Sequence, residues 1–147
     1  MRFEGTVNIN APPEKVWEFL TDAQLVSQCA PGLEKMEVVV PGQEFRAVAS
    51  VGFGSVKATF TTDVEWLELL PPEHAKMKAH GTAPGSGVDA ISDMYLTSNP
   101  DGSTELKWNA DIVVVGTIAS LASRLMGSVT KKITAAFFDC VKAKIEA

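Results

Sequence analysis

The C-terminal segment from Thr117 to Ala147 constrains the fold more than any other part of this chain. Its apolar residues recur at three- and four-residue steps, which is the period of a helix with one buried face. They are Ile118, Leu121, Leu125, Val129, Ile133, Phe137, Cys140 and Val141. This pattern predicts one long amphipathic helix over 117–146. Because the preceding chain has the pattern of strands, the apolar stripe must be buried against a sheet.

Upstream of this helix the sequence alternates with a period of two. The clearest case is 55–66, where Val56, Phe60 and Trp66 fall on even positions and polar residues fall on odd ones. Such alternation predicts a strand with one buried and one wet face. Further strands are expected over 2–10, 36–40, 45–51, 75–82, 88–98 and 104–114, and the glycine-rich stretch 81–87 is expected to be a loop.

Two short helices are predicted between the first strand and the rest. Asn10 is a candidate cap for a helix that begins near Pro12, and Asp22 is a candidate cap for a second helix that Pro31-Gly32 ends. The predicted order of elements is one strand, two short helices, a run of strands and one long helix. This order predicts the α+β class. We expect about seven antiparallel strands, curved by their twist around the C-terminal helix, in a single domain over 1–147.

Composition and charge exclude several functions. The net charge of -5 argues against nucleic acid, which requires a basic face. No apolar signal-peptide core opens the chain, and no apolar run approaches the roughly 18 residues of a membrane span. Cys29 and Cys140 have no metal-ligand spacing, so we expect core thiols in a reducing cytosol, although the sequence leaves a disulfide open.

The residues expected on the inner face of the sheet are small or apolar. Large side chains such as Phe60, Met77 and Trp108 alternate with small ones such as Ala90 and Ala110. Two interpretations stay open. Small residues let a helix approach a sheet closely, or they leave a cavity of the concave, apolar kind that binds ligands. Gly127 within the helix favours a packing or access role, since a glycine there costs about 1 kcal/mol relative to alanine.

Catalytic groups are not evident on that face. Charged strand residues fall on the outward parity, and His74 and His80 are expected to be lone surface residues. No nucleophile elbow, phosphate loop or metal-ligand cluster occurs in the sequence. The only polar residues that we find near the inner face are Thr62, Ser92 and Arg124. Arg124 is either a surface residue or a polar contact for a ligand at a cavity mouth.

Several motifs together resemble a known family. They are INAPPEKVWEFLTD (9–22), CAPGLEKME (29–37), VGFGSVKATF (51–60), GTAPGSG (81–87), VGTIASLASRLM (115–126) and AAFFDC (135–140). The chain resembles the START-like helix-grip superfamily, also called SRPBCC, and within it the CoxG family of carbon monoxide dehydrogenase subunits. It departs at Val115-Gly116, where a double glycine is frequent, and at Ala122, where a glycine is common.

The resemblance implies a non-enzymatic protein that binds an apolar ligand under the long helix, an isoprenoid quinone (menaquinone or ubiquinone) or a lipid, with no covalent cofactor and no metal. It implies a link between a molybdenum-containing carbon monoxide dehydrogenase and the membrane quinone pool. Open alternatives are a recruitment adaptor without ligand and a small cyclase- or aromatase-like enzyme. A cytoplasmic location is expected, at the inner face of the membrane if an anchoring tail follows Ala147. The expected ligand-binding residues are Leu20, Leu25, Cys29, Phe60, Trp66, Met77, Met94, Trp108, Ala110, Leu121, Arg124, Leu125 and Val129.

Overall fold

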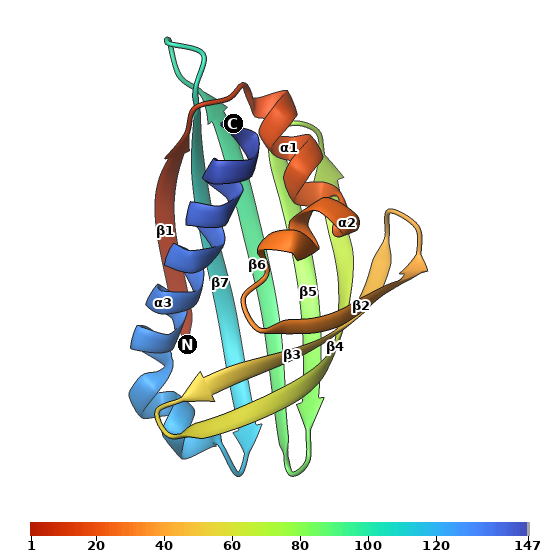
Figure 1. Ribbon diagram of the computed structural model, residues 1–147, viewed down its shortest axis with the longest axis vertical. Coiled ribbons are helices and arrows are strands. Elements are labelled where there is room, and N and C mark those ends of the chain that lie inside the picture. Colours follow the sequence, from red (N-terminus) through yellow and green to blue (C-terminus); the bar gives the residue numbers. More distant parts are fainter. Residues whose placement is uncertain (147) are drawn as a thin grey trace.

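A computed structural model describes residues 1–146. Seven strands form one antiparallel sheet in the order β1-β7-β6-β5-β4-β3-β2. Figure 1 shows this sheet curving around the helix α3 (Ala119–Ile145), with α1 (Pro13–Thr21) and α2 (Ala23–Val26) beside the C-terminal end of α3. The remaining elements are β1 (Arg2–Ile9), the 3-10 turn η1 (Ser27–Cys29), β2 (Leu33–Val40), β3 (Glu44–Phe53), β4 (Val56–Leu70), β5 (His74–Ala83), β6 (Ser86–Ser98) and β7 (Thr104–Gly116). The predicted α+β architecture is confirmed.

The alternation expected in β4 is present. Phe60 and Val64 are buried on the inner face, while Thr59 and Thr61 are exposed on the convex face. The strand continues beyond the predicted end at residue 66, because a register irregularity between Trp66 and Glu68 absorbs one residue without ending the pairing with β5.

The glycine-rich stretch 81–87 is a tight hairpin, so the expectation of a loop is wrong. Ala83 pairs with Ser86, and only Pro84 and Gly85 lie between β5 and β6. Gly85 has φ +74°, a left-handed conformation that glycine adopts without a Cβ penalty. Its carbonyl accepts hydrogen bonds from the backbone N–H of Thr117 at 2.9 Å and from the Thr117 hydroxyl at 2.9 Å, which ties the hairpin to the start of α3.

The two short helices begin differently from each other. Asp22 caps α2 as predicted, and its Oδ1 accepts from the N–H groups of Gln24 at 2.9 Å and Leu25 at 3.2 Å. Asn10 does not cap α1, because Pro12 occupies the N-cap and makes no side-chain cap hydrogen bond. The backbone N–H of Asn10 instead donates to the carboxylate of Glu146 at 3.1 Å.

Helix α3 is anchored at its two ends. Of its residues only Ala122, Val141 and Ile145 are fully buried. Two separate apolar clusters result: one joins the C-terminal end of α3 to α1 and η1, and the other joins the start of α3 to β3 and β4. The middle of α3, including Val129, Ile133 and Phe137, is only half-buried.

A disulfide joins Cys29 of η1 to Cys140 of α3, so the expectation of free core thiols is wrong. The sequence could not place these residues together, since 111 positions separate them. The fold brings their Cα atoms to 5.4 Å, within the range that a disulfide requires. The bond ties the α1–α2–η1 segment to the C-terminal half of α3.

Candidate ligand-binding site

The inner face of the sheet is not closed by the helix that crosses it. Ala79, Ala90 and Ala110 point towards α3 from the central strands, yet all three remain partly exposed to solvent. In a solid helix-on-sheet core, small residues at such positions are fully buried, because close packing leaves no room for water above them. Partly exposed alanines between two apolar clusters indicate an open inner space between α3 and the sheet.

Two grooves open beside this inner space. The first, of about 450 Å³, lies between β1 and α3 and has Phe3, Val7, Trp108 and Phe138 among its apolar lining. The second, of about 500 Å³, lies between the α1–α2 segment and the β2–β3 hairpin. Its apolar lining residues are Trp17, Ala23, Val38, Val40, Pro41, Phe45 and Trp66. Both volumes lie within the range of small-molecule sites.

The ligand-binding residues predicted from the sequence are distributed over the two apolar clusters, the two grooves and the inner face of the sheet. Leu20 and Cys29 are buried in the cluster around α1, against which Leu25, Met94 and Trp108 pack. Phe60 is buried in the other cluster, against which Leu121, Leu125 and Val129 pack. Trp66 and Trp108 line the second and the first groove, and Met77 and Ala110 are half-buried on the inner face outside both clusters. Arg124 is exposed on α3 and lines neither groove.

Other residues of the two grooves were missed by sequence reasoning. Phe3, Gly5 and Val7 of β1 lie on the inner parity, but a strand pattern does not reveal which strand is an edge. Trp17 and Phe45 line the second groove and were not among the residues expected to bind a ligand. No local signal in the sequence shows that the α1–α2 segment stands apart from the β2–β3 hairpin.

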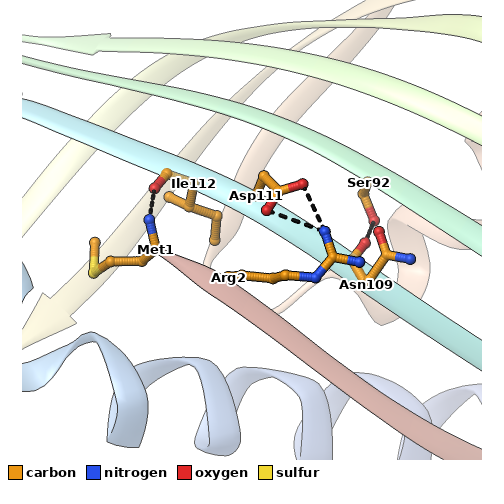
Figure 2. A network of polar contacts seen from close by, with 6 residues as sticks. All are labelled: Met1, Arg2, Ser92, Asn109, Asp111 and Ile112. Atoms are coloured by element: carbon orange, nitrogen blue, oxygen red, sulfur yellow. Dashed lines mark hydrogen bonds and ion pairs between the residues drawn. The ribbon is translucent and has the colours of Figure 1, made fainter.

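Of the two inner-face hydroxyls that the sequence singles out, Thr62 and Ser92, that of Ser92 is already engaged. Figure 2 shows Ser92 directed to the backbone of β7, where its Oγ donates to the carbonyl oxygen of Asn109 at 2.8 Å. Charged strand residues lie on the convex face, where Arg46 pairs with Asp63 at 2.8 Å and Arg2 pairs with Asp111 at 3.0 Å. The hydrogen bond and negative charge of Asp63 raise the pKa of the Arg46 guanidinium. Within residues 1–146 no three His, Cys, Asp or Glu side chains are grouped to hold a metal ion.

The two histidines have partners, so the expectation that they are lone is wrong. His80 Nδ1 lies 2.6 Å from Asp89 Oδ1, and His74 Nε2 lies 2.7 Å from Asp93 Oδ1. The His74 ring also stacks on Tyr95 with a centroid distance of 4.5 Å. All of these contacts join β5 to β6 on the convex face, away from the inner space, because the antiparallel register sets the pairs opposite or diagonal to each other.

The fold is that of known helix-grip proteins. A conserved protein from Geobacillus kaustophilus superposes with a TM-score of 0.91 at 25% identity, covering 99% of this chain and 95% of that one. The ZhuI aromatase/cyclase from a Streptomyces species superposes with a TM-score of 0.76 at 22% identity, covering 99% and 93%. A protein from Thermus thermophilus gives a TM-score of 0.70 at 14% identity, covering 99% and 97%. No curated protein matches the chain in sequence.

The family can be stated more narrowly than the fold. Residues 5–146 match the family model of CoxG, a subunit of carbon monoxide dehydrogenase. The chain therefore belongs to the CoxG family, as its motifs indicate. Family and fold together support a role in binding a hydrophobic ligand. In the described part of the chain, no helix is both long and apolar enough to cross a membrane.

Proposed function

We propose that this protein binds a long apolar molecule, an isoprenoid quinone or a lipid, between α3 and the sheet, and does not turn it over. The observation that carries the proposal is the partial exposure of Ala79, Ala90 and Ala110 beneath a helix anchored only at its ends. Binding of an apolar chain there removes apolar surface of both the ligand and the protein from water. At about 25 cal/mol per Å², burial of some 300 Å² would contribute on the order of 7 kcal/mol, less the costs of ordering and association.

The placement of polar groups supports binding without chemistry. General acid–base catalysis needs a titratable side chain within hydrogen-bond reach of the substrate. The acids and bases of β3 to β7 alternate to the convex face, the Ser92 hydroxyl is engaged, and Arg124 is exposed on α3. The likeness to an aromatase/cyclase is one of fold, and it does not transfer that enzyme's activity.

The binding experiment uses the two inner-face tryptophans as probes. Trp66 and Trp108 should be quenched saturably by menaquinone and respond weakly to a short, soluble quinone, because the tail supplies most of the burial. Protein used for the titration is first extracted with organic solvent, and the extract is analysed by mass spectrometry for a retained lipid or quinone. If ligand-free protein gives no saturable response to menaquinone or to a fatty acid, the proposal fails and an adaptor without ligand remains.

We further propose that the bound quinone connects a molybdenum-containing carbon monoxide dehydrogenase to the membrane pool, in keeping with the family name. The test is a reconstitution with the purified dehydrogenase, carbon monoxide and vesicles that contain menaquinone. Quinone reduction should increase when this protein is added. The Ala110→Trp variant, which fills the inner space, should lose that increase. Equal quinone reduction with and without the protein would refute the link to the dehydrogenase but would leave ligand binding untouched.

A further inference from the structure

The groove between β1 and α3 contains backbone donors that no strand satisfies. β1 is an edge strand and pairs only with β7. Met1 and Ile112 exchange both backbone bonds, at 2.8 and 2.7 Å, and the first of these is drawn in Figure 2. Because antiparallel partners alternate between bonded and non-bonded pairs, the next bonded pairs are Phe3 with Ala110 and Gly5 with Trp108. The backbone N–H and C=O groups of Glu4 and Thr6 therefore point away from β7, and both residues line the groove.

The same edge already binds an oxygen acceptor further along the chain. The N–H of Asn10, just past the end of β1, donates to Glu146 Oε2 at the end of α3 at 3.1 Å. Figure 1 shows α3 running beside β1, and residues of both elements line the groove. At Glu4 and Thr6 the helix supplies no such acceptor in the described residues, and the groove occupies that place.

The indole of Trp108 supplies a third donor. Gly5, its strand partner, has no side chain, and a Cβ built there would lie 2.7 Å from Trp108 Nε1. The indole therefore lies across β1 in space that only a glycine leaves free. Trp108 is half-buried and lines the groove; no hydrogen bond from its Nε1–H is found among residues 1–146, and this N–H is open to solvent. An indole N–H can only donate, so an acceptor that enters the groove can bind it in place of water.

Charges in the groove balance. Lys131 and Lys142 of α3 line it together with Glu4 and Asp139. Two cations and two carboxylates around the groove give no net attraction for an anion. Uncharged N–H donors and balanced charge favour a neutral acceptor.

We propose that this groove seats the polar head of the ligand, and that this head is a neutral carbonyl rather than a carboxylate. One carbonyl oxygen accepts from Trp108 Nε1–H, and a free-edge N–H of Glu4 or Thr6 offers a separate donor within the same groove. The tail follows the indole into the inner space, where Met94 lies opposite Trp108 on the neighbouring strand. The assignment rests on the proposed function and adds the location, the donors and the class of the head group.

The test compares menaquinone with palmitate by native mass spectrometry in a non-ionic detergent. Trp108→Phe removes the N–H and keeps an aromatic ring, and it should weaken menaquinone binding about three- to tenfold, the range of one net hydrogen bond. Tyr95→Phe, on the exposed convex face, is the matched control, since it removes a polar hydrogen from an aromatic side chain away from the groove, and it should bind as the wild type does. Gly5→Ala should also weaken binding, because the new Cβ displaces the indole; circular dichroism verifies the fold of each variant.

The charge balance is tested separately. The double variant Glu4→Gln with Asp139→Asn leaves Lys131 and Lys142 uncompensated, so the affinity for palmitate should rise several-fold relative to the affinity for menaquinone. If wild-type protein binds menaquinone but Trp108→Phe binds it equally well, the head-group assignment is overturned and the proposed function stands. Tighter binding of palmitate than of menaquinone by the wild type also overturns the assignment. If the wild type binds neither probe, the proposed function itself has failed.

Discussion

The disulfide between Cys29 and Cys140 should contribute a large share of the stability of this fold. The bond closes a loop with a sequence separation of 111 residues. A cross-link lowers the conformational entropy of the unfolded chain, and the loss grows with the logarithm of loop length. For this separation the chain-entropy relation gives about 4.8 kcal/mol at 25 °C. With about 2–4 °C per kcal/mol for a chain of this size, reduction should lower Tm by roughly 10–20 °C.

The assay is urea unfolding followed by tryptophan fluorescence, with and without dithiothreitol. The double variant Cys29→Ala with Cys140→Ala is the control, because it lacks the bond in both conditions and should ignore the reductant. Wild-type protein under oxidising conditions should unfold at a higher midpoint than the variant. Its mass should be two hydrogens lower than that of the reduced form. Identical unfolding midpoints with and without reductant would refute the reasoning.

Three further predictions follow from local contacts. Ala110→Trp should fold with a stability loss below the roughly 1–3 kcal/mol of an overpacked core, measured by urea unfolding; a loss above that range would indicate a solid core. Asp22→Ala should cost about 0.5–2 kcal/mol, because two N–H groups at the start of α2 lose their cap; Gln24→Ala is the control, and equal midpoints for the two variants would contradict the cap. Hydrogen bonds from the Ser103 hydroxyl and N–H lower the pKa of Asp101, so their stabilisation is present above the unfolded pKa and is lost as pH falls through the folded one. Ser103→Ala should raise that pKa in an NMR titration, and an unchanged titration would contradict the assignment.

Much of the fold could be predicted from the sequence because the patterns that indicate it involve residues close together in the chain. The period of two over 55–66 depends only on neighbours two positions apart, and the stripe from Ile118 to Val141 depends on neighbours three and four apart. Asp22 caps a helix through N–H groups two and three positions away. The motifs that indicate the CoxG family are likewise contiguous. These features therefore do not depend on how distant parts of the chain are arranged in space.

Features that depend on distant partners were decided by the tertiary structure. The Cys29–Cys140 bond requires η1 and α3 to meet, and the carboxylate partners of His74 and His80 require the register of β5 against β6. The order of the strands decides which side of β1 has no neighbouring strand. The register of β1 against β7 places Trp108 opposite Gly5. Periodicity states which side of an element is apolar. It does not state how closely two apolar faces pack, and in this protein the tertiary structure leaves Ala79, Ala90 and Ala110 on the inner face partly exposed.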